Sequence, residues 1–185
     1  MRNALVPLAD GFEELEAVSV IDVLRRGGVK VTTAAVGESL YVVGANSMTV
    51  KADKFFADAE GETYDVIVLP GGGPGTERLK ASEQVLERLR RQREERRLLA
   101  AICAAPTVLV EAGVLDENIH VTCYPTCQME LDRAWSPASV VADGGIITSQ
   151  APGTALLFAL VVLQHLCGDT VAHKVARGMV TDVLE

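Results

Sequence analysis

Short apolar runs alternate with helical patterns along almost the whole chain, and this alternation limits the possible folds more than any other feature. Residues 66–69 are apolar at every position, which is typical of a strand buried on both faces of a parallel sheet. Residues 13–26 instead repeat apolar side chains at helical spacing and end at Gly27-Gly28. Strands that alternate with helices predict an α/β fold, with a mostly parallel central sheet and helices on both faces.

The same patterns place the individual elements. We expect strands at residues 4–8, 29–36, 66–69, 98–102, 120–123 and 146–148, and helices at residues 13–26, 76–93, 153–166 and 170–180, with a further helix after Cys103. Residues 38–56 are rich in β-forming side chains, which predicts a hairpin at a sheet edge. The mixed charges of residues 87–97 are typical of a solvated helix face. No linker or repeat interrupts residues 1–185, so we expect a single domain.

The composition excludes several classes of protein. The chain has 185 residues, of which 49% are hydrophobic, and this is enough to bury a core without disulfides. Its net charge of -8 argues against a nucleic-acid partner, because phosphate binding needs a concentrated positive surface. The longest apolar stretch, residues 155–163, is well short of the roughly 20 residues of a membrane span, so we expect no membrane partner. Few cysteines and no signal-peptide pattern predict a reducing, cytoplasmic location.

One cysteine stands where a predicted strand meets a predicted helix. Cys103 ends the apolar run 98–102 and precedes Ala104-Ala105-Pro106-Thr107, which has the character of a helix start. This arrangement resembles a nucleophile elbow, a sharp turn that lifts a nucleophile off the sheet. The free N–H groups and the dipole of a helix start favour the thiolate over the thiol. A buried structural cysteine is the alternative, and the local pattern leaves it open.

Three loops define the candidate site. Ligands of open parallel sheets bind beyond the carboxyl ends of the strands, and residues 9–16, 70–76 and 103–106 meet that description. The glycine-rich segment 71–75 lacks both the Lys-Ser/Thr ending of a P-loop and the spaced glycines of a dinucleotide fingerprint, so we expect no nucleotide cofactor. Its backbone N–H groups can face an oxyanion formed at Cys103; a plain tight turn is the alternative.

Three glutamates open the first predicted helix. For Glu13 and Glu14 the helix dipole is a sufficient explanation. Glu16 lies between apolar neighbours, and if it points inward its pKa rises. A protonated Glu16 can donate a hydrogen bond to a Cys103 thiolate and carry a proton during catalysis. The sequence pattern alone does not bring these two residues together.

Metal and histidine chemistry have little support. Cys123 and Cys127 are four residues apart, but a structural zinc site needs further ligands nearby, so we expect no metal. No histidine flanks Cys103. His120 begins a predicted strand that can approach the site, and the other two histidines fall in the closing helices.

Four segments match, in order, the motifs of one known family. They are Ala9-Asp10-Gly11-Phe12-Glu13-Glu14-Leu15-Glu16, Asp65-Val66-Ile67-Val68-Leu69-Pro70-Gly71-Gly72, Ala100-Ala101-Ile102-Cys103-Ala104-Ala105-Pro106 and Thr148-Ser149-Gln150-Ala151-Pro152-Gly153-Thr154. Nearly end to end, the chain closely resembles the ThiJ/PfpI superfamily, in the branch of the parkinsonism-associated protein deglycase and its bacterial relatives. The resemblance implies a flavodoxin-like sandwich that forms a homodimer.

The resemblance also implies roles for particular residues. It assigns the reactive nucleophile to Cys103 and the protonated carboxyl partner to Glu16, and it assigns the oxyanion donors to the backbone N–H groups of Gly72 and Ala104. In one place the chain departs from the pattern, because Tyr124 stands where the human protein has a histidine; several bacterial relatives also lack it. The proteases of the superfamily carry a histidine directly after the cysteine, where this chain has Ala104, so we do not expect peptidase activity.

Two functions of different classes follow as expectations. One is a glyoxalase or deglycase type of enzyme that needs no cofactor and acts on methylglyoxal, glyoxal or their protein adducts through Cys103. The other is an oxidative-stress sensor or redox-regulated chaperone whose Cys103 is oxidised. Both use an accessible thiolate, so the sequence does not separate them. The physiological substrate and the reactivity of Cys123 also stay open, and the first helix and the hairpin at 38–56 are candidates for the dimer surface.

Overall fold

Strands from across the chain form one central sheet in the order β5-β2-β1-β6-β7-β9-β8. The computed structural model describes residues 1–116, 118–131 and 135–184. The strands of this sheet are β1 (Asn3–Leu8), β2 (Lys30–Ala35), β5 (Lys54–Phe55), β6 (Val66–Leu69), β7 (Leu98–Ile102), β8 (Val140–Asp143) and β9 (Ile146–Ser149). Neighbouring strands are parallel except for β8 and β9, which pair antiparallel. The predicted α/β fold with a mostly parallel sheet is confirmed.

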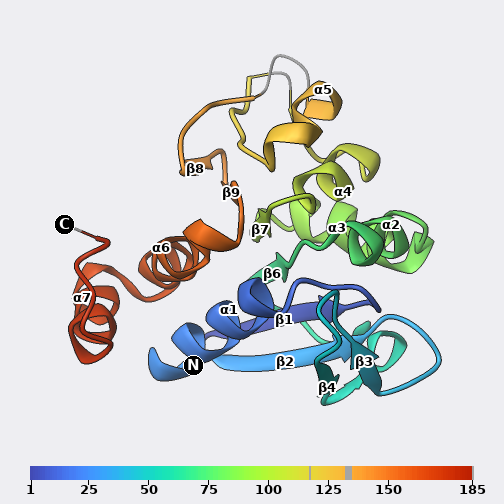
Figure 1. The fold of residues 1–185 in the computed structure, drawn as a ribbon, viewed down its shortest axis with the longest axis horizontal. Helices are drawn as coiled ribbons and strands as arrows, with labels where there is room; N and C mark the ends of the chain where they lie inside the picture. Colours follow the sequence, from blue (N-terminus) through green and yellow to red (C-terminus); the bar gives the residue numbers. More distant parts are fainter. Residues whose placement is uncertain (117, 132–134, 185) are drawn as a thin grey trace.

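Helices cover both faces of this sheet (Figure 1). They are α1 (Glu14–Arg26), α2 (Gly73–Lys80), α3 (Glu83–Glu94), α4 (Pro106–Glu111), α5 (Gln128–Leu131), α6 (Ala155–Cys167) and α7 (Asp169–Gly178), with short 3-10 turns at Phe56–Ala59, Pro125–Cys127 and Pro152–Thr154. On one face α1, α6 and α7 pack with Ala4, Val6 and Leu8 of β1. On the other face α2, α3 and α4 pack with Leu5 of the same strand. Alternate residues of one strand therefore enter two separate hydrophobic clusters, as a strand buried on both sides requires.

The apolar segments behave as their patterns predict. All four residues of β6 are buried, and β1 is buried at every position after Asn3. The apolar stretch 155–163 lies within α6, which is a core helix as expected. None of the helices in the described part of the chain has the length and apolar character of a membrane span.

The hairpin forms, but it does not extend the central sheet. Strands β3 (Tyr41–Val43) and β4 (Thr49–Lys51) pair antiparallel as a separate two-stranded sheet. The edge of the central sheet is instead the two-residue β5, which follows β4 directly and pairs parallel with β2.

The predicted helix at residues 76–93 is wrong as a single element. It is two helices, α2 and α3, because Ser82 has an extended backbone and its side chain accepts a hydrogen bond from the backbone N–H of Val85, which starts a new helix. The expectation of a solvated face at residues 87–97 also fails in part. Arg88 and Gln92 are buried, and the Gln92 side-chain amide donates to the carbonyl oxygens of Tyr64 and Leu98, which ties α3 to the sheet.

The predicted strand at residues 120–123 is also wrong. Val121 makes an isolated bridge to Trp135, and the place beside β7 is taken by β9. The sequence reading missed β8, whose antiparallel pairing with β9 turns at Gly144-Gly145. Only half-buried and exposed residues make up β8, so it lacks the apolar run that marks the inner strands.

Candidate active site

The three predicted loops meet at the carboxyl ends of β1, β6 and β7. Strand order reverses between β1 and β6, since the chain passes from β1 to β2 on one side and returns to β6 on the other. The backbone N–H of Glu13 donates to the Gly71 carbonyl oxygen at 2.9 Å, and that of Gly75 donates to the Gly11 carbonyl oxygen at 3.2 Å. Cys103 follows the last residue of β7, the neighbour of β6. The predicted gathering of these loops is confirmed.

Cys103 occupies a sharp turn between β7 and α4. Its φ of 63° lies in the left-handed region, where residues with a side chain are uncommon. Hydrogen bonds hold both of its peptide groups: its N–H donates to the Ser149 carbonyl oxygen at 2.9 Å, and its carbonyl oxygen accepts from the Tyr124 N–H at 2.7 Å. The expected strand-to-helix turn is therefore present, in a strained form that resembles a nucleophile elbow.

Two backbone donors lie near the Cys103 sulfur. Burial raises the pKa of the thiol, and the N–H groups of Gly72 and Ala104 oppose this rise by favouring the negatively charged form. The Cys103 residue is only 8% exposed, as the structural-cysteine alternative also required. Burial alone therefore does not separate a reactive cysteine from a structural one.

The glycines of the loop after β6 allow this close approach. A Cβ atom on Gly71 would lie 2.7 Å from Cys103 Cβ and 2.8 Å from Glu16 Oε2. A Cβ atom on Gly72 would lie 2.3 Å from the Gly11 carbonyl oxygen, and the φ of Gly72 is 90°. Both positions therefore exclude a side chain. The cause is the close approach of other parts of the chain, and not only the conformation of a tight turn.

Glu16 lies beside the cysteine, in the first turn of α1. The helix starts at this point because the Glu13 carboxylate caps it and accepts from the Glu16 N–H at 2.8 Å. Glu16 has no exposed surface, and its Oε2 accepts from the Gly71 N–H at 2.7 Å. Its Oε1 is buried and has no hydrogen-bond partner among the described residues. Burial raises the pKa of Glu16 to about 7, against the opposing hydrogen bond from Gly71.

The proton state of Cys103 depends on that of Glu16. Burial and a negative charge on Glu16 raise the pKa of the Cys103 thiol to about 12. The expectation of a thiolate favoured by a helix start is thus not met, since α4 begins only at Pro106 and burial dominates. Once Glu16 holds a proton, its charge no longer opposes the thiolate, so the two groups titrate as a coupled pair.

Two other groups at the site were missed or misjudged from the sequence. Ser149 was not a candidate, yet its carbonyl oxygen fixes Cys103, and its hydroxyl lies 2.6 Å from Thr154 Oγ1. The only local signal for Ser149 is its place directly after the apolar run 146–148. Glu14 does more than complement the helix dipole. Its carboxylate accepts hydrogen bonds from the backbone N–H of Asn46, from the side-chain amide of Asn46 and from the backbone N–H of Met48.

The remaining candidates lie away from the sulfur or serve other contacts. His120 pairs with Asp143 at the end of β8, so the idea that it approaches the site is wrong. Cys123 is buried and donates to the Tyr124 carbonyl oxygen at 3.2 Å, whereas Cys127 is partly exposed. Burial raises the pKa of both thiols. Across the described ranges, no three His, Cys, Asp or Glu side chains are arranged to hold a metal ion.

This fold is shared with a known family. Residues 2–165 match the model of the DJ-1/PfpI family, and the chain belongs to that family.

Several relatives match at about 40% identity. Protein dj-1beta of Drosophila melanogaster is 40% identical over 181 residues, which are 96% of each chain. Protein DJ-1 homolog B of Arabidopsis thaliana is 41% identical over 165 residues; these are 89% of this chain but 38% of the plant protein, so the chain spans well under half of that relative. Glutathione-independent glyoxalase DJR-1.2 of Caenorhabditis elegans is 36% identical over 183 residues, again 96% of each chain.

Solved structures agree with the fold. Toxoplasma gondii DJ-1, in an oxidized form, superposes with a TM-score of 0.95 at 36% identity, covering 98% of this chain and 99% of that one. Drosophila melanogaster DJ-1beta superposes with a TM-score of 0.94 at 38% identity, covering 98% of both chains. The flavodoxin-like class expected from the resemblance is thereby confirmed.

Proposed function

We propose that the protein is a cysteine-dependent, cofactor-independent enzyme of the glyoxalase or deglycase type, which acts on methylglyoxal, glyoxal or their protein adducts. The Cys103 sulfur adds to the aldehyde carbon and forms a carbon–sulfur bond. The aldehyde oxygen becomes an oxyanion, which the N–H groups of Gly72 and Ala104 stabilise. The thiol proton passes to Glu16, the buried base beside it.

The rest of the reaction rearranges the adduct and releases it. Glu16 first returns the thiol proton to the oxyanion, which gives a neutral hemithioacetal and a free carboxylate. The carboxylate then moves the proton on the former aldehyde carbon to the neighbouring carbon through an enediol, while the hydroxyl proton moves to the neighbouring oxygen. This leaves the Cys103 thioester of a 2-hydroxy acid. Water then cleaves the thioester, which gives the free acid and restores the thiol. The net change is the addition of one water to methylglyoxal to give lactate, with no external oxidant or reductant.

One observation carries this proposal: the fully buried Glu16 carboxyl group lies beside Cys103, which stands in a left-handed turn between a strand and a helix. The pKa of Glu16 is raised to about 7 by burial. A general base works best when its pKa is near the working pH, and Glu16 meets that condition. The name of the C. elegans relative, a glutathione-independent glyoxalase, supports the same reaction class.

The test is conversion of methylglyoxal to lactate without glutathione, under reducing conditions. We expect many turnovers for the wild type and a loss of at least about a hundredfold in kcat/KM for Cys103→Ser and for Glu16→Gln. Cys167→Ser and Glu38→Gln are matched controls, because Cys167 lies at the end of α6 and Glu38 is exposed. Turnover that persists in Cys103→Ser, or its absence from the wild type, rejects the proposal.

A second candidate is an oxidative-stress sensor or redox-regulated chaperone. The observation that favours it is the Toxoplasma gondii structure, which is described as oxidized. In this chain a protonated Glu16 beside Cys103 can stabilise an oxidised sulfur by hydrogen bonding. A sensor consumes about one oxidant equivalent per thiol, so mass spectrometry after peroxide treatment, together with absent dicarbonyl turnover, identifies it.

We also propose a homodimer that forms through α1 and the hairpin. Five large apolar side chains are exposed on these neighbouring elements: Leu15, Val18, Tyr41, Val43 and Met48. Burying such a patch against a second copy removes it from water. Light scattering of the wild type should give a dimer mass, and Val18→Glu should give a monomer.

The four free cysteines fit a reducing, cytoplasmic compartment, which microscopy of a tagged chain can check.

A further inference from the structure

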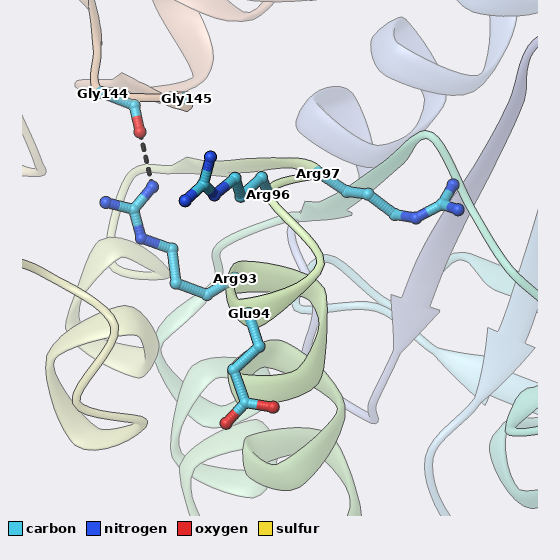
Figure 2. Close-up of a pocket in the computed structure, with 6 residues that line it drawn as sticks. All are labelled: Arg93, Glu94, Arg96, Arg97, Gly144 and Gly145. Carbon is cyan, nitrogen blue, oxygen red and sulfur yellow. Dashed lines mark hydrogen bonds between the residues drawn. The ribbon is translucent and has the colours of Figure 1, made fainter.

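A charged hollow lies at the opposite end of the sheet from Cys103. It has a volume of about 420 Å³ and is lined by Arg93, Glu94, Arg96, Arg97, Gly144 and Gly145 (Figure 2). These residues stand at the end of α3, just before β7, and at the turn between β8 and β9. Cys103 follows the other end of β7, so the length of a five-residue strand, roughly 16 Å, separates the two places.

Arg93 is held in position at one wall of the hollow. Its Nη1 donates to the Gly144 carbonyl oxygen and its Nη2 to Asp116 Oδ2, each at 2.5 Å. Two of its five N–H groups are used in this way, which leaves three for another partner. Arg97 is committed elsewhere, because it pairs with Glu95 and donates to the Tyr64 carbonyl oxygen. Figure 2 shows Arg97 directed away from Arg93 and Arg96.

Arg96 is exposed and has no ion pair or side-chain hydrogen bond within the part of the chain that the structure describes. Figure 2 shows its guanidinium group on the same side as that of Arg93, toward the Gly144–Gly145 turn, whereas the Glu94 carboxylate points the other way. The charge of Arg93 is offset by its ion pair with Asp116, whereas the charge of Arg96 has no described counterion.

The backbone at Arg96 adds an independent observation. Its φ is 54°, and it follows Glu95, the C-cap of α3, in the left-handed position where helices usually place glycine. Its N–H donates to the Arg93 carbonyl oxygen, so the turn itself is an ordinary helix end. A glycine would form this turn without strain. The chain instead has an arginine at this position, although the arginine side chain makes no hydrogen bond to a described group that would compensate for the strain.

The facing wall carries no side chains. Gly144 and Gly145 have φ values of 54° and 82°. A Cβ atom on Gly145 would lie 3.7 Å from Arg93 Nη1, and one on Gly144 would meet Ile119 at 2.9 Å. Glycine at these positions leaves the Arg93 guanidinium group open on this side.

From this geometry we propose that Arg93 and Arg96 bind a phosphate group in the hollow beside the Gly144–Gly145 turn, as free phosphate or as part of a small phosphate ester. Guanidinium groups match phosphate because their N–H groups form paired, charge-assisted hydrogen bonds with its oxygens. Asp116 offsets one of the two positive charges, so the site has one cation in excess and several free N–H donors, which suits the many acceptor oxygens of a phosphate. The site is unusual in a chain with a net charge of -8.

The experiment is an NMR titration of the full-length protein with inorganic phosphate, and separately with glycerol 3-phosphate, at constant ionic strength. Saturable shifts of the backbone amides of Arg96, Gly144 and Gly145 are expected. Arg96→Gly should weaken binding by about tenfold or more, which corresponds to one lost charge-assisted hydrogen-bonding group. This variant should fold at least as stably as the wild type, because it places glycine in the left-handed position.

Arg91→Gln is the matched control. It removes the same charge from α3, but Arg91 pairs with Glu95 and does not line the hollow. Tighter binding of the ester identifies an organic phosphate as the ligand, and equal binding points to free phosphate. The proposal is overturned if neither probe gives a saturable response, or if Arg91→Gln weakens binding as much as Arg96→Gly, which would show a general charge effect.

Discussion

The backbone N–H of Tyr124 donates a 2.7 Å hydrogen bond to the carbonyl oxygen of Cys103. Together with the bond from the Cys103 N–H to Ser149, it fixes a cysteine whose φ is 63°. The Tyr124 side chain is 41% exposed and takes no part in this contact. The support of the turn at position 124 therefore comes from the backbone and does not depend on the type of side chain there.

Tyr124→Pro should weaken the turn where Tyr124→Ala does not. The φ of Tyr124 is −56°, which proline can adopt, so the main change is the lost N–H donor. We expect Tyr124→Pro to lower the free energy of unfolding by about 1–3 kcal/mol more than Tyr124→Ala, since the Cys103 carbonyl loses its partner. Urea unfolding of the two variants measures this difference. Equal stabilities would mean that the hydrogen bond does not hold the turn.

Glu16 should make the folded state less stable as the pH rises. Its pKa is raised to about 7 in the folded protein, so the native state binds the proton more tightly than the unfolded chain does. The stability that this proton confers is complete below about pH 4.5 and is lost as the pH rises through about 7. Relative to Glu16→Gln, the wild type should lose on the order of 3 kcal/mol across this interval.

Urea unfolding at a series of pH values checks this dependence, with Glu38→Gln as the control for an exposed carboxyl group. Parallel curves for the wild type and Glu16→Gln would contradict a raised pKa at Glu16.

Gly72→Ala should disrupt the site, and Gly73→Ala should not. A methyl group on Gly72 meets backbone atoms of the loop after β1 and also requires a left-handed alanine, whereas a Cβ on Gly73 meets nothing within 4 Å. We expect Gly72→Ala to cost about 2–4 kcal/mol of stability and to abolish dicarbonyl turnover. Gly73→Ala should stay within about 0.5 kcal/mol of the wild type. Thermal unfolding and the lactate assay together test the pair, and a stable, active Gly72→Ala protein would disprove the steric argument.

Glu14→Gln should loosen the hairpin. Burial opposes ionisation of Glu14, but hydrogen bonds from Asn46 and Met48 outweigh it and lower its pKa. The charged form thus stabilises the hairpin at neutral pH, and this stabilisation is lost as the pH falls through the lowered pKa. We expect faster amide hydrogen exchange at residues 41–51 in Glu14→Gln, with a loss of about 1–2 kcal/mol. If amide hydrogen exchange at residues 41–51 were unchanged in Glu14→Gln, the Glu14 carboxylate would not be what stabilises the hairpin.

The sequence predicted those parts of the fold that local patterns encode. Continuous apolar runs identified β6 and α6, and their alternation with helices was enough to place the three loops at one end of the sheet. The strand predicted at residues 120–123 is absent, because the apolar segment there packs into the core without joining the sheet. The half-exposed β8 carries no such run and was missed.

The site depended more on tertiary contacts. The position of Cys103 was readable, since a strand end and a helix start flank it in the sequence. The contact between Glu16 and Cys103 was available only from the family resemblance, because the packing of α1 against the β6 loop decides it. The hydrogen bond from Cys103 to the Ser149 carbonyl involves a backbone group, which no side-chain pattern reports.

The hydrogen bond to Ser149 has a consequence for biosynthesis. Ser149 is supplied by β9, which the ribosome makes well after β7, so the left-handed turn at Cys103 lacks one of its two supports in a nascent chain. A chain that ends before β9 therefore cannot form the hydrogen bond that holds the N–H of Cys103, whatever the state of the strands already made.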